Sequence, residues 1–545
     1  MVQTVLATRL AQLTPVAHDM ANVAAVIGRE FPVSVLARAS GESDETVVRG
    51  LDELWQRRIV REQGAGAAET YDFSHDKLRE QIYESLSPAY RRLLHRHVAE
   101  AFKAVYGEDQ DAVSGQIAAH YEHGGLHAQA IPYYHRAGEA TRRLYANAEA
   151  IHAFERAAAL LDAHAPEQAR QDWPWETAAQ VYESLGDVST ELGCAQEASQ
   201  AYHHAMTCVP EQARLWQARL HRKTASSWNH ASTNPHDLFP VTARQAFQDA
   251  ERILTQAADP SSPVWRQEWI ELQFAQIWPL RWSADDMTAT IDKARPIVEQ
   301  HGTEEQREFL AYAIATRDFI RNRYVTTMSE QKMSSRRAAI AAIQQTGNKS
   351  KLGVYHLAFG IALLCSGHLD EAEEQLGQAL RVGEQIGGAR LQARCLTFLP
   401  FIFRRRGQVE QVRRILTQAQ VIGAARNNSI LTGHRAWVAW RDGNLAEAEI
   451  AGRTSVEEEP YQQRESNPFQ WVGRWPLIGV ALAQGKIAAA MNDARLLLDP
   501  SQQPPPEHMG ALLEAALCAW DAGQQEEAHT LLQQAVPLAE QGGYL

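Results

Sequence analysis

The sequence predicts an all-α chain in which a small head precedes a solenoid of stacked helix hairpins. The main observation is a repeated pattern: a glycine, an alanine five residues later, a large apolar residue after four more, and a second alanine after three more. The full pattern begins at Gly125, Gly193, Gly367 and Gly523. Two further observations are helical periodicity that is almost continuous from about residue 111, and an apolar content of 45% with 22% charged residues, which is typical of globular proteins.

Each residue type in this pattern has a physical role in a helix hairpin. The glycine permits a tight turn, the first alanine lets two helices approach, the large residue fills the groove between them, and the second alanine admits the next hairpin. Such hairpins cannot bury their apolar faces alone, so they stack into an array. A stacked array offers a long surface, and the sequence therefore favours a binding protein over one built around a reaction centre.

Residues 1–107 are predicted to form a winged-helix head, which consists of three helices and a small β-hairpin. Ser43 is the expected N-cap of the helix at 44–57. The hairpin is predicted from two short alternating segments, 59–62 and 70–73, around the turn Gly64-Ala65-Gly66. The head helices are expected at 5–13, 16–27, 32–39, 44–57, 76–86 and 88–106.

The remaining chain divides by the regularity of its repeats. Residues 108–210 are predicted to form tetratricopeptide-like repeats, 211–350 irregular helical repeats, and 351–545 tetratricopeptide-like repeats again. Turn glycines in the last region are spaced 36 to 42 residues apart, which is longer than the 34 residues of the standard unit. These glycines are Gly367, Gly407, Gly443, Gly485 and Gly523.

Composition excludes several classes of protein. The net charge of −13 argues against nucleic acid as a direct partner. The five cysteines are spread along the chain without a C-x2-C pair, which favours reduced thiols in a cytoplasmic protein. No stretch of 18 apolar residues and no basic N-terminal segment followed by an apolar one occurs, so neither a membrane partner nor a signal peptide is expected.

The head carries a resemblance to a known family. The motif Phe73-Ser74-His75-Asp76 and the segments 24–31, 51–54, 76–86 and 90–95 resemble the winged-helix region that follows the ATPase core of bacterial STAND signalling ATPases. These include LuxR-type and antibiotic-pathway regulators and ATPase modules linked to cyclases or kinases. The repeats resemble the sensor region of the same proteins. The resemblance implies a transcriptional regulator that binds a protein partner or a small-molecule effector on the repeat surface and acts on an ATPase domain in cis or in trans.

The sequence also departs from that family. No G-x4-G-K-[ST] motif is present, so no ATP site, no cofactor and no enzymatic activity are predicted for the chain. Residue 1 stands where the lid of the ATPase would be ending, and 535–545 resembles a segment that continues in the family. We therefore expect the sequence to be a fragment of a longer regulator.

Two apparent binding motifs are better explained by structural roles. The expected recognition helix at 44–57 carries four acidic residues, and residues 1–110 hold 13 basic and 16 acidic side chains, so DNA phosphates would be repelled. His120, His123 and His127 lie close in sequence, but no nearby cysteine or carboxylate completes a metal site. We expect structural histidines and no bound metal.

Two groups remain as candidates for the effector or partner surface. Four tryptophans could line a concave surface, or could instead fill gaps in the irregular repeats. Three consecutive arginines could bind an acidic partner. Alternatively, they could stand at the C-terminus of a helix, where the helix dipole favours positive charge. The groups are Trp265, Trp269, Trp278 and Trp282, and Arg404, Arg405 and Arg406. The alternatives to a sensor region are a freestanding tetratricopeptide adaptor and a hydrolase site within 211–350.

Overall fold

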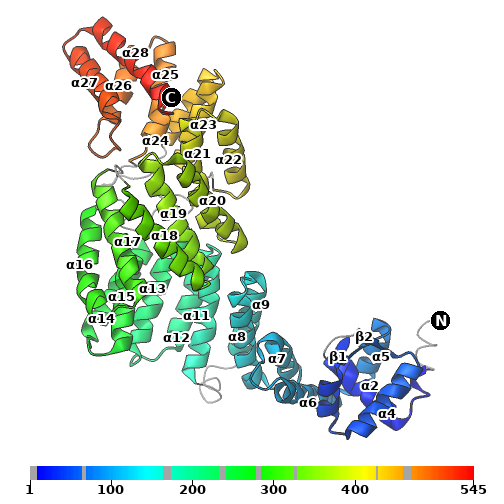
Figure 1. The fold of residues 1–545 in the computed structure, drawn as a ribbon. Coiled ribbons are helices and arrows are strands. Elements are labelled where there is room, and N and C mark those ends of the chain that lie inside the picture. Colours follow the sequence, from blue (N-terminus) through cyan, green and yellow to red (C-terminus); the bar gives the residue numbers. More distant parts are fainter. Residues whose placement is uncertain are drawn as a thin grey trace. The chain divides into compact units, whose positions relative to one another are not determined.

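The computed structural model describes residues 9–63, 69–163, 174–231, 241–277, 284–323, 328–424, 428–457 and 468–545. Within these ranges the predicted all-α solenoid is confirmed, with one small three-stranded sheet among the helices (Figure 1). The chain divides into two compact units. Unit 1 comprises Met1–Val188 and His204–Pro210, and unit 2 comprises Ser189–His203 and Glu211–Leu545.

The first part of unit 1 contains the helices and the hairpin that the sequence predicts. The expected helix at 5–13 and the turn at 64–66 lie largely or wholly outside the described residues. Ser43 caps its helix as predicted, because its hydroxyl accepts a hydrogen bond from the backbone N–H of Thr46. The elements are α2 (Pro15–Ile27), β1 (Glu30–Pro32), α3 (Val33–Ser40), α4 (Asp44–Gln56), β2 (Val60–Gln63), β3 (Thr70–Phe73), α5 (Asp76–Ser85) and α6 (Pro88–Tyr106).

Strand β1 was not predicted, because three residues are too few to show a period of two. It pairs antiparallel with β3, and β3 pairs antiparallel with β2, so the strand order is β1-β3-β2. The buried ring of Phe31 on β1 packs against the ring of Phe73 on β3, with centroids 5.9 Å apart. The third strand therefore extends the hairpin over the apolar core of the head.

Helix hairpins make up the rest of unit 1. Gly125 adopts a φ of 73° at the turn between the first two helices, a value that glycine adopts without strain. The boundary between the units falls within the last two helices. The elements are η1 (Asp111–Val113), α7 (Ser114–His123), α8 (His127–Arg143), α9 (Asn147–Asp162), α11 (Trp175–Glu191) and α12 (Ala195–Cys208).

The first half of unit 2 lies between residues 214 and 345, where the glycine–alanine pattern is absent. Its helices carry two small apolar clusters, one around Phe247 and Trp265 and one around Phe274 and Ile291. The helices are α13 (Arg214–Ala231), α14 (Val241–Gln256), α15 (Pro263–Ile277), α16 (Ala284–His301), α17 (Glu304–Arg321) and α18 (Glu330–Gln345).

The second half of unit 2 forms one continuous apolar core that extends to Leu545. It runs from α19 toward the red end of the ribbon in Figure 1. The helices are α19 (Lys349–Cys365), α20 (Leu369–Gln385), α21 (Ala389–Arg405), α22 (Val409–Val421), α23 (Ser429–Arg441), α24 (Leu445–Glu457), α25 (Trp471–Ala483), α26 (Ile487–Leu497), α27 (Glu507–Asp521) and α28 (Gln525–Gln541).

The predicted roles within the repeated pattern are confirmed in the hairpin α19–α20. Gly367 has a φ of 86° at the turn, and Ala372, Leu376 and Ala379 are fully buried. A Cβ atom on Gly360 of α19 would come within 2.7 Å of the Leu376 side chain, so the two helices approach closely. Among the described residues, no helix combines the length and the apolarity needed to cross a membrane.

Candidate functional site

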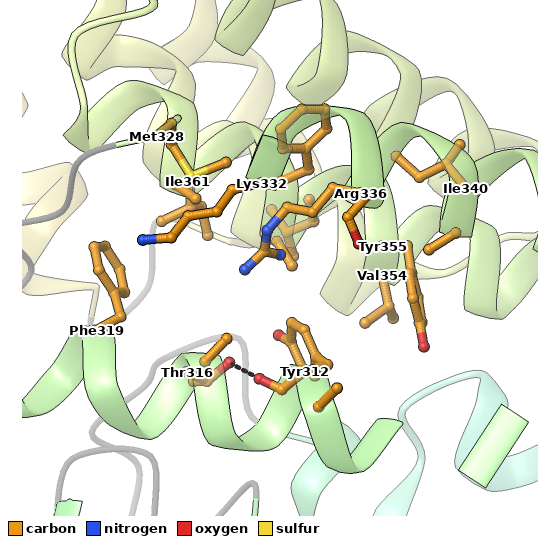
Figure 2. Close-up of a pocket in the computed structure, with 18 of the residues that line it drawn as sticks. Tyr312, Thr316, Phe319, Met328, Lys332, Arg336, Ile340, Val354, Tyr355 and Ile361 are labelled. Atoms are coloured by element: carbon orange, nitrogen blue, oxygen red, sulfur yellow. Dashed lines mark hydrogen bonds between the residues drawn. The ribbon is translucent and has the colours of Figure 1, made fainter. Parts of the chain in front are cut away.

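A cavity of about 940 Å³ lies within unit 2, with walls from α17, α18, α19 and α21 (Figure 2). Its volume falls within the range of small-molecule binding sites. Helix α18 packs on α19, whereas α17 and α18 make few direct contacts although they are consecutive helices. The cavity therefore occupies the place where a hairpin interface would otherwise form.

Small side chains on three of the wall helices keep this space open. An alanine side chain ends at Cβ, so helix faces made of alanines fill little volume unless the helices approach as closely as α19 and α20 do. The alanines that line the cavity are Ala311 and Ala315 on α17, Ala338, Ala339 and Ala342 on α18, and Ala358 and Ala362 on α19.

Arg336 projects into the centre of the cavity from α18 (Figure 2). It lies three residues after Met333 and four before Ile340, both of which are buried, so it occupies a position on the apolar stripe of its helix. Burial lowers the pKa of the Arg336 guanidinium, and the nearby hydroxyls of Tyr312 and Tyr355 act in the opposite direction. No carboxylate in the described parts of the chain contributes to that pKa. Arg336 is thus a half-buried cation that no carboxylate in the described ranges neutralises.

Aromatic and apolar side chains surround this cation. The rings of Tyr312 and Tyr355 stack with centroids 6.0 Å apart and an interplanar angle of 26°. Burial, together with the charge of Glu308, raises the pKa of Tyr355 to about 12, so its phenol stays protonated at neutral pH. The apolar side chains lie at the two ends of the cavity in Figure 2: Phe319, Met328 and Ile361 at one end, and Ile340 and Val354 at the other.

Several other charged residues on the walls have partners or are exposed, whereas Glu308, like Arg336, is half-buried. Asp318 forms an ion pair with Arg317, at 2.7 Å from its guanidinium nitrogen. Arg390 and Arg394 each have partners of their own. Glu304 is exposed at the start of α17. The electrostatic character at the centre of the cavity is therefore set by Arg336.

The predicted tryptophan surface lies outside this cavity. Trp265 is 5% exposed, its indole Nε1 donates a hydrogen bond to the carbonyl of Leu254 at 2.9 Å, and its ring stacks on Trp269 at 5.3 Å. Both tryptophans pack into the apolar cluster of α13, α14 and α15. Trp278 and Trp282 lie outside the described residues. The placement of Trp265 and Trp269 matches the gap-filling alternative.

The three consecutive arginines contact other parts of the chain. Arg404 is 1% exposed, and its guanidinium donates hydrogen bonds to the carbonyls of Gly543 at 3.0 Å, Tyr544 at 2.7 Å and Val472 at 3.3 Å. Burial lowers the pKa of Arg404 to about 9. Arg405 donates to the carbonyl of Leu364 at 3.1 Å. Arg406 pairs with the carboxylates of Asp370 and Glu373.

The histidines singled out in the sequence lie in unit 1, where one of them contacts a fourth histidine. The Nδ1 atoms of His95 and His120 are 2.9 Å apart, and the Tyr83 hydroxyl is 2.9 Å from Nε2 of His95. Burial lowers the pKa of His95 to about 3 and that of His120 to about 4, and the ring of His123 lies 5.0 Å from that of His95. The described residues contain no group of three histidine, cysteine or carboxylate side chains arranged to hold a metal ion.

Sequence reasoning missed Arg336, although a signal for it exists. Buried apolar residues on α18 recur as Met333, Ile340 and Ile343, and Arg336 interrupts that stripe. A charged residue on the apolar stripe of a helix is the pattern that would have identified it. The tryptophans between 265 and 282 and the arginines at 404–406 are more conspicuous in the sequence than this single residue.

Comparisons with known proteins give a partial sequence match and structural alignments with low scores. No protein-family model matches the chain. An uncharacterised protein of Rhizobium meliloti is 27% identical over 156 residues, a match that spans 28% of this chain and only 15% of that protein. A STAND protein with a tetratricopeptide repeat sensor from Pyrococcus horikoshii aligns with a TM-score of 0.48 and 11% identity, over 83% of this chain and 64% of that one. Yeast Tom70 aligns with a TM-score of 0.33 and 12% identity, over 78% and 98%.

Proposed function

We propose that this chain is the sensor and relay region of a STAND-type signalling protein, a transcriptional regulator, and that an effector binds in the cavity between α17, α18, α19 and α21. The observation that carries the proposal is the cavity itself, which has the volume of a ligand site and lies inside a helical repeat array. Its walls combine apolar surface with a cation that lacks an acidic partner.

A ligand in this cavity would act on the spacing of the hairpins. It would touch four wall helices at once, and so would favour one separation of α17 from α18. In a repeat array each unit contacts its neighbours, so a change in one hairpin interface passes to the next. The ligand shifts the equilibrium between two arrangements only to the extent that it binds them with different affinities.

The relay part of the proposal rests on the head. Its resemblance to the winged-helix region that follows a STAND ATPase core would place it between the repeats and an ATPase domain, in cis or in trans. The alternative function is a freestanding adaptor, which is favoured by the regular hairpins from α19 to α28 and their potential to present a protein-binding surface.

Two neighbouring alanines on α18 allow a matched test of the cavity. Both are exposed, but Ala342 lines the cavity and Ala341 does not. Small molecules that raise the melting temperature of the wild type should slow hydrogen exchange in α17, α18 and α19. They should lose this effect in Ala342→Trp and keep it in Ala341→Trp. Equal loss in both variants, or protection confined to other helices, would contradict an effector site in the cavity.

The relay is tested separately. The chain is titrated into an intact STAND ATPase, with and without a ligand found in the first experiment, and ATP hydrolysis and assembly size are measured. We expect the chain to change at least one of the two. If neither changes at any concentration, the relay claim is wrong and the adaptor function becomes the better explanation.

A further inference from the structure

We propose that the cavity recognises an organic anion, with a carboxylate or a phosphate bound to Arg336 and an apolar body that extends toward Phe319, Met328 and Ile361. This inference rests on the proposed function and adds the chemical class of the effector. It follows from the charge at the centre of the cavity, from the absence of an internal partner for that charge, and from the space around it.

The Arg336 guanidinium lies where water has been partly removed from it. Arg336 projects from an apolar stripe into the cavity, and the groups that counteract the effect of burial on its pKa are the phenols of Tyr312 and Tyr355. Removing a cation from water is costly unless an anion or hydrogen-bond acceptors replace the lost water. Among the described residues no carboxylate does this for Arg336. An anionic ligand would supply the missing counter-charge.

The geometry of the donors fits an oxyanion. A guanidinium presents parallel N–H groups that bind two oxygens of one carboxylate or phosphate at once. Lys332, one turn earlier on α18, also points into the cavity in Figure 2 and adds positive potential on the same side. The Thr316 hydroxyl, by contrast, donates to the carbonyl of Tyr312 at 2.9 Å within α17, so this donor is already used.

The volume argues for an organic ligand rather than an inorganic ion. A carboxylate or phosphate group would occupy only a small part of a cavity of about 940 Å³. Apolar side chains line much of the remaining wall at both ends, and the stacked rings of Tyr312 and Tyr355 offer a surface for an aromatic ring. An inorganic ion would leave this apolar surface in contact with water.

The acidic residues on the wall do not reverse this preference. Asp318 is exposed and paired with Arg317, and Glu304 is exposed at the first turn of α17. Glu308 lies close enough to Tyr355 to raise the pKa of its phenol. A cationic ligand would therefore meet Arg336 at the centre of the cavity, and Glu308 is the half-buried carboxylate on the wall that it could reach.

The test uses four probes with one common body and different heads: 4-phenylbutyrate, 4-phenylbutyl phosphate, 4-phenylbutanol and 4-phenylbutylamine. Binding to the full chain is measured by isothermal titration calorimetry for the wild type, Arg336→Met, Arg336→Lys, Arg337→Met and Ala342→Trp. Arg337 is the matched control, because it neighbours Arg336 but pairs with Glu371 and does not line the cavity. Circular dichroism confirms that each variant is folded.

We expect the two anionic probes to bind the wild type more tightly than the alcohol, and the amine to bind most weakly. Arg336→Met should weaken the anionic probes by about tenfold or more and leave the alcohol unchanged, because it removes charge-assisted hydrogen bonds but little apolar surface. Arg336→Lys should restore part of the affinity, and Arg337→Met should have no effect. The stronger of the two anionic probes identifies the preferred head group.

Two outcomes would overturn the inference and can be told apart. In the first outcome, the alcohol or the amine binds as tightly as the anions, or Arg336→Met leaves the affinity for the anionic probes unchanged. If Ala342→Trp also abolishes binding in that case, the cavity is a ligand site but not an anion site. If no probe of any charge binds the wild type at millimolar concentration, the anion assignment is wrong, and the cavity loses its support as an effector site as well.

Discussion

Two arginines in unit 2 each lie near buried apolar residues of their own helix, but their other surroundings differ. Arg404 on α21 is enclosed by three backbone carbonyls and lies over the rings of Trp437 and Trp471. Arg336 on α18 has a cavity and two tyrosines around it. The described residues supply acceptors for the first guanidinium and none for the second. A buried arginine is therefore a structural residue or a ligand anchor according to what the chain places around it.

A similar contrast holds between two helix pairs of unit 2. In α19–α20 the repeated pattern closes the interface, with the Leu376 side chain in the groove and an alanine on either side in sequence. In α17–α18 the pattern is absent, alanines line both helices, and a charged residue takes the place on the apolar stripe that a leucine would fill. Loss of the repeat pattern is what leaves room for a ligand.

The largest expected effect comes from replacing the enclosed arginine. Arg404→Met removes the donors of three interior carbonyls, and each unpaired buried acceptor costs on the order of 1 kcal/mol or more. We expect the free energy of unfolding of unit 2 to fall by about 2–4 kcal/mol. Urea unfolding followed by tryptophan fluorescence measures it, since Trp437 and Trp471 lie against Arg404.

Arg336→Met is the matched comparison for that measurement. It removes a cation for which the described residues provide no carboxylate, and it leaves no described acceptor unpaired. We therefore expect its unfolding midpoint to equal or slightly exceed that of the wild type. If both variants lose similar stability, the distinction between a structural and a ligand-binding arginine fails.

A second prediction concerns the backbone segment that covers Arg404. Gly543 has a φ of 72°, and a Cβ atom there would lie 2.6 Å from the backbone nitrogen of Arg405. Gly543→Ala must therefore move the segment that carries the carbonyls of Gly543 and Tyr544, at a cost of about 2 kcal/mol or more. Hydrogen exchange in α21 and α28 should accelerate.

The control for this variant is Gly523→Ala. Gly523 has a similar φ of 79° but nothing within 4 Å of the added Cβ, so only backbone strain of about 1 kcal/mol applies. Equal effects of the two substitutions would show that the close approach to α21 contributes nothing.

The sequence predicted the fold more completely than the site, for physical reasons. Gly367, Ala372, Leu376 and Ala379 report contacts between helices adjacent in the chain, so local spacing identifies them. The surroundings of Arg404 could not be predicted, because its acceptors lie 68, 139 and 140 residues away in sequence. Strand β1 was missed because it is short and pairs with a strand about 40 residues later.

The cavity required a different kind of information. It depends on how far α17 and α18 stand apart, and no local pattern in the sequence states a distance between helices. The alanines of α18 are compatible with close packing or with an open space, since alanine favours helix in either case. Only the position of Arg336 on the apolar stripe was available in advance, and it was overlooked in favour of Arg404, Arg405 and Arg406.

A third prediction extends the comparison to buried groups that stay neutral. The pKa values of His95 and His120 are lowered to about 3 and about 4, below the 6.5 of an unfolded chain. Protons therefore bind the unfolded state first as the pH falls below about 6.5, and the stability of unit 1 falls with them. We expect a loss on the order of 1 kcal/mol between pH 7 and pH 6, measured by urea unfolding at each pH.

A variant separates this effect from general acid sensitivity. His120→Asn removes one of the two titrating rings, so the slope of stability against pH between pH 7 and pH 5 should become shallower, even if the variant is less stable at pH 7. A slope that is unchanged would mean that the contact between His95 and His120 does not set the acid sensitivity of unit 1.

The smallest expected effect is that of Arg337→Met, which defines the baseline for every arginine substitution above. Arg337 pairs with Glu371 through two hydrogen bonds of 2.8 and 2.9 Å, but its side chain is 48% exposed, so water competes for both ions. Exposed pairs of this kind contribute about 0.5 kcal/mol, and salt screens them. The urea midpoint should shift only slightly at low ionic strength and not measurably in 0.5 M salt, a condition in which Arg404→Met should keep its full effect. If Arg337→Met lowers the free energy of unfolding as much as Arg404→Met does, α18 is held in place mainly by its outer face. The cavity on its inner face could then open or close without changing the contacts that hold the helix.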